Sequence, residues 1–263
     1  MIRLACATLS IEGFGETNFN KTFDIAPKIG YRFIEFNCWY PSSLTPETIR
    51  SLKQRCFEHE LTPIAIHLNG GFGGDPVRDF CHKVQAMQAI KALGGGMIVS
   101  SGFERGKEGG IKSVIKSLKN LIPVAEEIGV QISLENHVDN NIENIDDYRR
   151  IFDAINSKQV GICIDTGHFD AAGVDITALI DEFAPHVNHI HLKENRGIGE
   201  KRFSRFMEGT TDNKSIIEKM ISLGYSGYMT VELSPEIGET DGRPFELEDL
   251  RLPYKMFSEY ERA

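Results

Sequence analysis

One carboxylate and one imidazole group lie close together in the segment that ends at His168. The apolar run Val160–Ile164 has the character of a strand buried on both faces, and Asp165, Thr166 and Gly167 follow it directly. Asp and His side chains three residues apart, at the end of a buried strand, can form half of a metal site. The same segment can instead cap a helix through Asp165 and Thr166 and leave His168 on a surface loop. Alone, this segment leaves both interpretations open.

Two more carboxylates and a pair of histidines also follow apolar residues. Glu135 ends the run Ile-Ser-Leu-Glu, and Glu232 ends the run Met-Thr-Val-Glu. A buried carboxylate is costly unless it is paired or binds a cation. His189 and His191 share one face of a strand because strand side chains alternate, and His191 is nearer to the C-terminal end. His191 is therefore the better candidate ligand, whereas His189 can equally be a packed, hydrogen-bonded interior residue.

Alternating apolar and amphipathic segments must position these side chains. Eight short apolar segments are predicted as strands: Leu4–Leu9, Tyr31–Cys38, Pro63–Leu68, Met97–Ser101, Val130–Glu135, Val160–Asp165, Val187–Leu192 and Gly227–Leu233. Eight further segments are predicted as helices: Asn18–Ile29, Thr45–Glu60, Pro76–Leu93, Ile111–Ile128, Ile145–Ile155, Asp175–Phe183, Asn213–Leu223 and one within Pro244–Tyr260. Strict alternation of this kind predicts parallel strands joined by crossover helices.

Eight such units in one chain predict an α/β fold, a closed (β/α)8 TIM barrel that spans residues 1–263 as a single domain. No GxGxxG follows the first strand and no GxxxxGK[ST] occurs, which disfavours the nucleotide-binding open sheets. In a TIM barrel the functional residues lie at the C-terminal ends of the strands. Glu135, Asp165, His191 and Glu232 all fall at such ends, so their convergence predicts a metal site.

The composition limits the class of protein. A hydrophobic content of 41% and a charged content of 25% are ordinary for a globular protein. The net charge of -9 disfavours general nucleic-acid binding, because proteins that neutralise phosphates are normally basic. No apolar run approaches the length of about 18 residues that marks a membrane span. The five cysteines never form a CxxC pair, which favours a reducing compartment. We therefore expect a cytoplasmic protein that binds neither nucleic acid nor membrane.

Motifs at four successive strand ends form an ordered set. They are Leu134-Glu135-Asn136-His137, Ile164-Asp165-Thr166-Gly167-His168, His189-Ile190-His191-Leu192-Lys193 and Val231-Glu232-Leu233. This set resembles the xylose isomerase-like TIM-barrel superfamily, which includes sugar-phosphate isomerases, ketose 3-epimerases, inosose dehydratase and the apurinic endonucleases. The resemblance implies that Glu135, Asp165, His191 and Glu232 bind one divalent cation. Three carboxylates and one imidazole favour Mn²⁺, with Mg²⁺, Co²⁺ or Zn²⁺ as alternatives.

The resemblance also implies an activity. We expect a metal-dependent isomerase or epimerase that acts on a small ketose or sugar phosphate by proton transfer through an enediolate, with Glu135 and Glu232 as the acid/base pair. By similarity to the ketose 3-epimerases, His168 and Arg196 would contact substrate oxygens, although Arg196 can also be a solvated loop cation. His67, at the end of the third strand, is either a further substrate contact or a hydrogen-bonded core histidine.

Two further groups of residues are predicted near the same end of the barrel. The cations Lys193, Arg196, Lys201, Arg202 and Arg205 could recognise a phosphate or carboxylate on the substrate, or only balance acidic neighbours. The aromatic residues Trp39, Phe72 and Phe103 could form an apolar wall against a sugar, or only cover the barrel mouth.

Two alternatives to an epimerase follow from departures in the sequence. Asn136 stands where the ketose 3-epimerases carry a Pro after the strand-five Glu, so a dehydratase of an inosose- or dehydroshikimate-type substrate with the same metal site is the main alternative. A non-catalytic binding barrel is the other. The endonucleases need a His after the fourth strand, where this chain has Ser100 and Ser101, which disfavours DNA repair. The expected partner is a small sugar-like molecule, with a homodimer or homotetramer possible.

Overall fold

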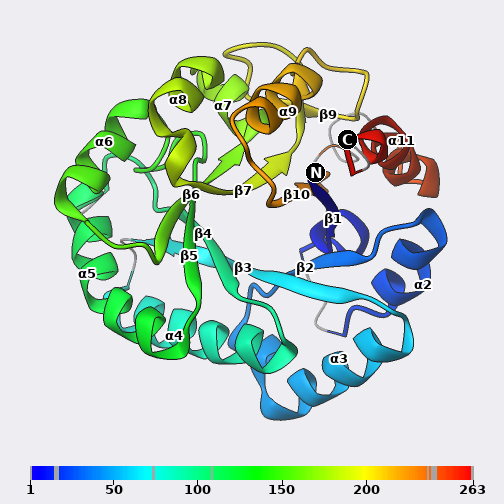
Figure 1. Cartoon of the computed structure of the whole chain (residues 1–263), viewed down its shortest axis with the longest axis horizontal. Helices are drawn as coiled ribbons and strands as arrows, with labels where there is room; N and C mark the ends of the chain where they lie inside the picture. Colours follow the sequence, from blue (N-terminus) through cyan, green and yellow to red (C-terminus); the bar gives the residue numbers. More distant parts are fainter. Residues whose placement is uncertain are drawn as a thin grey trace.

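The computed structural model describes residues 2–14, 18–72, 75–107, 109–235, 237 and 242–261, with the backbone alone at 69, 70 and 72. Eight parallel strands close into a barrel, and β10 pairs with β1 to complete the ring (Figure 1). The strands are β1 (Arg3–Ala7), β2 (Phe33–Asn37), β3 (Thr62–Phe72), β4 (Met97–Gly102), β5 (Gln131–Glu135), β6 (Val160–Asp165), β7 (Val187–Leu192) and β10 (Tyr228–Val231). This topology confirms the predicted (β/α)8 barrel.

An outer layer of helices surrounds the barrel (Figure 1). The longer helices are α2 (Asn20–Ile29), α3 (Pro46–Glu58), α4 (Pro76–Leu93), α5 (Gly110–Ile128), α6 (Ile145–Ala154), α8 (Ile176–Phe183), α9 (Asn213–Ser222) and α11 (Leu247–Phe257). Local sequence sets their ends: Thr45 accepts a hydrogen bond from the Thr48 amide to begin α3, and Gly94 and Gly129 adopt positive φ to end α4 and α5. Among the described helices, none has the length and apolar character needed to cross a membrane.

Several short elements were not predicted from the sequence as separate elements; most of them lie in the connections between strands and helices. They are α1 (Leu9–Glu12), α7 (Thr166–Ala172), the strands β8 (Glu194–Asn195) and β9 (Phe203–Ser204), and the 3₁₀ helices η1 (Pro41–Leu44), η2 (Ala184–His186) and η3 (Ser258–Glu261). Helix α7 begins directly after β6, because Asp165 caps its first turn. Strands β8 and β9 form an antiparallel ribbon within the long segment that follows β7. Both differences lie at the C-terminal end of the barrel.

The main core fills the space between the strands and the helices, and a smaller apolar cluster fills the barrel interior. The interior cluster consists of Ala5, Ile64, Ala65, Met97, Val99 and Cys163. Because side chains alternate along a strand, inward positions continue from this cluster toward the C-terminal ends. There the inward residues change from apolar to charged. The next inward residue after Cys163 in β6 is Asp165, and the next one after Ala65 in β3 is His67. The alternation therefore places polar side chains inside the barrel at its C-terminal end.

Candidate metal centre and active site

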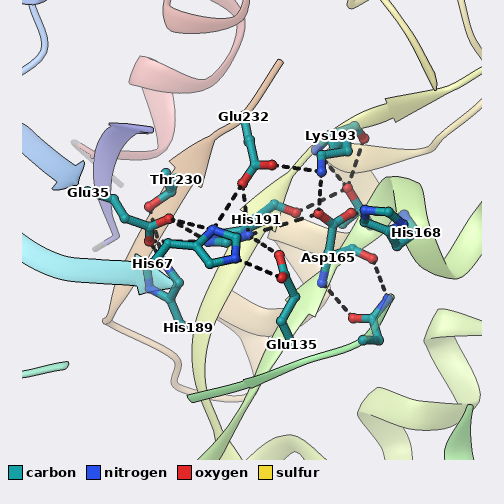
Figure 2. A network of polar contacts seen from close by, with 12 residues as sticks. Glu35, His67, Glu135, Asp165, His168, His189, His191, Lys193, Thr230 and Glu232 are labelled. Atoms are coloured by element: carbon teal, nitrogen blue, oxygen red, sulfur yellow. Dashed lines mark hydrogen bonds and ion pairs between the residues drawn. The ribbon is translucent and has the colours of Figure 1, made fainter. Parts of the chain in front are cut away.

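The four predicted metal ligands meet at the C-terminal end of the barrel. Glu135 ends β5, Asp165 ends β6, His191 lies in β7, and Glu232 follows β10; at most 2% of each residue is exposed. One ligand-type atom from each of the four lies within 4.8 Å of those from the others. Figure 2 shows the carboxylates of Glu232, Asp165 and Glu135 arranged around the imidazole of His191. Residues from four strands, up to 97 positions apart in the chain (232 − 135), therefore share one small volume.

His191 presents its two ring nitrogens to different carboxylates. Its Nδ1 lies 2.7 Å from Glu135 Oε1 and 3.1 Å from Glu232 Oε2, whereas its Nε2 lies 3.0 Å from Glu35 Oε1. Burial alone lowers the pKa of His191, but Cys163 and the carboxylates of Glu35, Glu232 and Glu135 raise it well above the usual value. A carboxylate behind a metal-binding histidine fixes the ring orientation and its tautomer. Glu35 occupies that position behind His191.

Glu35 contacts the cluster, although the sequence analysis did not single it out. It is fully buried in β2, and its Oε2 lies 2.8 Å from Nε2 of His189. Burial raises the pKa of Glu35, but the charge of His191 and the hydrogen bonds from the three neighbouring histidines lower it well below the usual value. The hydrogen-bonded interpretation of His189 is therefore confirmed. The sequence did contain a signal for Glu35: it lies between Ile34 and Phe36, which point outward from β2, so its carboxylate must point into the barrel.

Lys193 lies inside the carboxylate cluster rather than on a surface loop. Its Nζ is 2.9 Å from Asp165 Oδ2 and 2.8 Å from Glu232 Oε1, and only 3% of the residue is exposed. Burial lowers the pKa of Lys193, but the charges of Asp165 and Glu232 raise it above the usual value, so the amine is protonated. Lys193 thus supplies a positive charge between two of the four predicted ligands (Figure 2).

Asp165 performs two tasks at once. Its Oδ1 accepts a hydrogen bond of 2.8 Å from the His168 amide and caps α7, while its Oδ2 faces Lys193. The side chain of Asn136 exchanges two hydrogen bonds with the Asp165 backbone, at 2.9 and 2.8 Å, which fixes the end of β6. The helix-cap and metal-site interpretations of this segment are therefore compatible. The alternative that left His168 on a surface loop is wrong, because only 4% of His168 is exposed.

The donor set fits a divalent cation. Asp165 Oδ2 and Glu232 Oε2 are buried and accept no hydrogen bond from the described residues, although cationic neighbours lie nearby. Burial, together with repulsion from Glu135 and Glu232, raises the pKa of Asp165 despite the charge of Lys193. Three carboxylates and one imidazole are hard, oxygen-rich ligands of the kind that Mn²⁺ and Mg²⁺ prefer. A divalent ion would satisfy both orphaned oxygens.

A cavity of about 380 Å³ opens above the cluster. Polar residues in its lining are His67, Ser101, Glu135, His137, Asp139, His168, Lys193, Lys201, Glu232 and Ser234; apolar ones are Leu9, Phe14, Trp39, Leu68, Val138 and Phe203. This volume suits a small ligand, and the charged floor with an aromatic wall suits a polyhydroxylated one. Trp39 is thus placed as expected, while Phe103 does not line this cavity and the side chain of Phe72 lies outside the described residues.

His168 and His67 stand on opposite sides of the cluster (Figure 2). The Nδ1 of His168 accepts a hydrogen bond of 3.4 Å from the Val138 amide, which leaves Nε2 as the N–H donor. Burial and the neighbouring His137 lower the pKa of His168 well below the usual value, so its ring is neutral. His67 Nε2 lies 3.1 Å from Glu135 Oε2, and despite burial the charge of Glu135 raises the pKa of His67 to about 10. Both residues line the cavity.

Among the three predicted substrate-binding residues, Arg196 is the one that does not line this cavity. Its side chain is exposed and lines a separate, smaller cavity together with Arg202. Of the five loop cations, Lys193 and Lys201 line the central cavity. Lys201 Nζ lies 2.6 and 2.8 Å from the two carboxylate oxygens of Asp139, so this pair joins the segment after β7 to the segment after β5 across the mouth.

Known proteins resemble this chain over nearly its full length. The inosose dehydratase of Lacticaseibacillus casei is 21% identical over 90% of this chain and 83% of its own. Among solved structures, an IolI protein with a bound zinc atom gives a TM-score of 0.76 at 21% identity, covering 98% of this chain and 96% of that one. A D-allulose 3-epimerase from Methylomonas sp. gives a TM-score of 0.79 at 18% identity, covering 98% and 97%.

A family model supplies the most direct assignment. The model described as xylose isomerase-like TIM barrel matches residues 23–248. That range contains Glu35, which lies behind the imidazole of His191, and all four side chains of the carboxylate–imidazole cluster. It also includes seven of the eight barrel strands, since β1 alone precedes residue 23. The chain belongs to the xylose isomerase-like TIM barrel family.

Proposed function

We propose that this protein is a metal-dependent isomerase or epimerase of a small ketose or sugar phosphate, which moves a proton at the carbon next to a carbonyl through an enediolate. The observation that carries the proposal is the placement of Glu135 and Glu232. They come from different strands, both line the floor of the central cavity, and both contact Nδ1 of His191, at 2.7 and 3.1 Å. Two carboxylates in this arrangement can reach one substrate carbon from two directions.

One divalent cation would be held by Glu135, Asp165, His191 and Glu232. When bound, the ion would acidify the C–H bond beside the carbonyl and stabilise the negative charge that develops on oxygen. The oxygen-rich donor set favours Mn²⁺, while the zinc atom in the IolI protein supports Zn²⁺ as an alternative.

The remaining cavity residues would bind and orient the substrate. Glu135 would take the proton from the substrate carbon, and Glu232 would return one to the opposite face or to the neighbouring carbon. The Nε2–H group of neutral His168 would donate to a substrate oxygen, and His67 would hold Glu135 in position through the contact at 3.1 Å. Trp39 and Phe203 would cover the C–H faces of the sugar and exclude water.

A dehydratase is the second candidate, and Lys193 is the observation that favours it. Its protonated amine lies 2.8 Å from Glu232 and lines the same cavity, so it can reach a substrate hydroxyl. A carboxylate would remove the proton next to the carbonyl, the C–O bond at the neighbouring carbon would break, and the departing hydroxyl would leave as water with a proton from Lys193. The inosose dehydratase among the relatives supports this route.

Proton exchange in D₂O separates the two reactions. Metal-loaded protein is mixed with ketoses, ketose phosphates and inososes, and deuterium incorporation is followed by mass spectrometry. We expect deuterium in the recovered sugar or its epimer, and its loss in Glu135→Gln and Glu232→Gln. Growth of enone absorbance without a labelled epimer would instead establish the dehydratase. If neither signal appears with any of these carbonyl compounds, proton transfer is not the function.

Two properties of the whole protein also remain proposals. We propose a cytoplasmic location and a symmetric homodimer or homotetramer, in keeping with the usual symmetry of enzymes of this size. Light scattering coupled to gel filtration gives the mass of the assembly directly, and a monomer at micromolar concentration would contradict the second of these.

A further inference from the structure

The β8–β9 ribbon has two different faces. Glu194 pairs with Ser204 and Asn195 with Phe203, and the Arg196 amide donates to the Arg202 carbonyl at 2.9 Å. Because side chains alternate, Asn195 and Phe203 fall on one face of the ribbon, while Glu194, Arg196, Arg202 and Ser204 share the other. The Glu194 carboxylate is engaged by the amides of Met207 and Thr211, at 3.4 and 3.0 Å. The Phe203 ring lies 4.6 Å from His168 and 5.0 Å from Lys193 Nζ, so its face is the one toward the central cavity.

The opposite face borders a separate cavity of about 140 Å³. Its lining includes Arg196, Arg202, Ser204 and Arg205, and Phe203 lines both cavities and forms the wall between them. A space of this size accepts a small ion or the phosphate group of a larger molecule, but not a whole sugar.

Two arginines in this lining have no counter-charge among the described residues. Arg205 pairs with Asp249, and Glu208 pairs with Arg243 at 2.7 Å, so these charges are balanced. Arg196 and Arg202 form no side-chain ion pair or hydrogen bond with any part of the chain that the structure describes. Like charges directly opposite each other on paired strands repel and destabilise the pairing. This local excess of positive charge occurs in a chain whose net charge is -9.

A buried hydroxyl beside the two arginines also lacks a hydrogen-bond partner among the described residues. Ser204 is 9% exposed, its Oγ forms no hydrogen bond with the described residues, and it lines the same cavity as the two arginines. A buried hydroxyl without a partner costs free energy, so native structures usually supply one. Two guanidinium groups and one hydroxyl, converging on a small space, are the donors that a tetrahedral oxyanion accepts.

We propose that Arg196, Arg202 and Ser204 form a binding site for a phosphate-type oxyanion on the face of the β8–β9 ribbon opposite the central cavity. The oxyanion would neutralise the facing arginines and accept a hydrogen bond from Ser204. It would also hold the ribbon, and with it Phe203, in place beside His168. The site does not depend on the reaction proposed above, since none of its three residues lines the central cavity.

Calorimetric titration of inorganic phosphate and of sulfate, against chloride at equal ionic strength, tests this site. Both oxyanions should bind once per chain, and the double variant Arg196→Gln/Arg202→Gln should weaken binding at least about 10-fold. Ser204→Ala should weaken it by a smaller factor. The matched control is Lys201→Gln, which removes a cation from the segment between β8 and β9 on the central-cavity side and should change the affinity less than about 2-fold.

Three outcomes would overturn the site: no binding beyond that of chloride, binding unchanged in the double variant, or an equal loss with Lys201→Gln. Arg196 and Arg202 are exposed and make no ion pair with the described residues, so the double variant should fold with a thermal midpoint no lower than that of the parent, which is checked by circular dichroism. D-fructose 6-phosphate, with D-fructose as the neutral control, identifies the source of the oxyanion. Competition with inorganic phosphate assigns the site to a phosphorylated sugar, and phosphate binding without competition assigns it to a free anion.

Discussion

The two ends of the barrel bury polar side chains in opposite ways. At the N-terminal end the groups are neutral: Ser133 Oγ donates to Asn188 Oδ1 at 2.6 Å, and Asn188 Nδ2 donates to Gln131 Oε1 at 3.4 Å. Gly161 makes this contact possible, because a Cβ there would lie 2.4 Å from the Asn188 side chain. At the C-terminal end, carboxylates, histidines and Lys193 crowd together within ion-pair distance.

This difference indicates that the neutral end serves the stability of the fold and the charged end serves ligand binding. A neutral hydrogen-bonded network has little desolvation cost, whereas each buried carboxylate must be offset by a cation. Within the part of the chain that the structure describes, three carboxylate oxygens at the charged end, on Glu35, Asp165 and Glu232, still accept no hydrogen bond. An arrangement that costs free energy and leaves acceptors unpaired is typical of a site built for a ligand rather than for folding. The two ends should therefore respond differently to substitution.

Removing the proposed acid or base should have the largest effect. Glu135→Gln and Glu232→Gln should each lower the rate of substrate deuterium exchange by about 10²–10⁴-fold, because each takes away a proton carrier and a metal ligand. The matched control is Ser133→Ala at the neutral end, which should leave the exchange rate unchanged. Equal losses in all three variants would mean that the ends are not functionally distinct.

Replacing Lys193 should destabilise the metal-free protein. Lys193→Met leaves Asp165 and Glu232 without their cation, and breaking a buried pair costs about 3 kcal/mol in the free energy of unfolding. A bound divalent ion would supply that charge, so saturating Mn²⁺ should reduce the loss to below about 1 kcal/mol. Urea denaturation with chelator and with Mn²⁺ measures both values. The same loss in both conditions would show that Lys193 and the metal do not share these carboxylates.

Glu194, beside the charged end, should make stability depend on pH. Burial raises the pKa of Glu194 to about 7, although hydrogen bonds from the Met207 and Thr211 amides oppose the shift. A raised carboxyl pKa means that the neutral form is favoured in the folded protein, so stability present below about pH 4.5 is lost as pH rises to about 7.

Glu194→Gln keeps a neutral side chain at every pH. The difference in free energy of unfolding between this variant and the parent therefore measures the effect of ionising Glu194. The variant and the parent should have equal free energies of unfolding near pH 4.5, and by pH 8 the variant should be more stable by up to about 3 kcal/mol. Denaturant titrations at several pH values follow the difference. A difference that does not change with pH would rule out titration of Glu194 in this range.

The neutral end should give the smallest effect. Ser133→Ala removes the hydrogen bond to Asn188 and should cost about 1 kcal/mol of stability. Metal affinity should stay the same, because the hydroxyl lies two residues before Glu135, toward the other end of β5. A change in metal affinity comparable to that of Asp165→Asn would contradict the separation of the two ends.

The sequence predicted the barrel and the cluster because both follow from short periodic patterns. Apolar strands alternate with amphipathic helices, and each of Glu135, Asp165, His191 and Glu232 stands at the end of such a strand. A barrel brings all strand ends to one place, so the convergence needs no knowledge of side-chain conformations. The confirmed topology and the observed cluster rest on this rule.

Features that depend on backbone direction after the strands were not predictable in the same way. Lys193 belongs to a run that reads as a polar loop, and its burial follows from the path of the chain as it leaves β7. Arg196 falls on the far face of a ribbon whose strand pairing no local pattern indicated. The role of Glu35 depends on its distance to histidines in β3 and β7, which only the closed barrel determines.

Titration of metal into chelator-treated protein tests the central claim most directly. Asp165→Asn is the sharpest variant, because Asn can keep the cap on α7 while the ligand charge is removed. We predict that calorimetry and elemental analysis find one Mn²⁺ per chain in the parent protein and that the ion raises its thermal midpoint. Asp165→Asn should bind Mn²⁺ at least about 10-fold more weakly. Absence of bound metal, together with thermal stability that chelation leaves unchanged, would contradict the metal site.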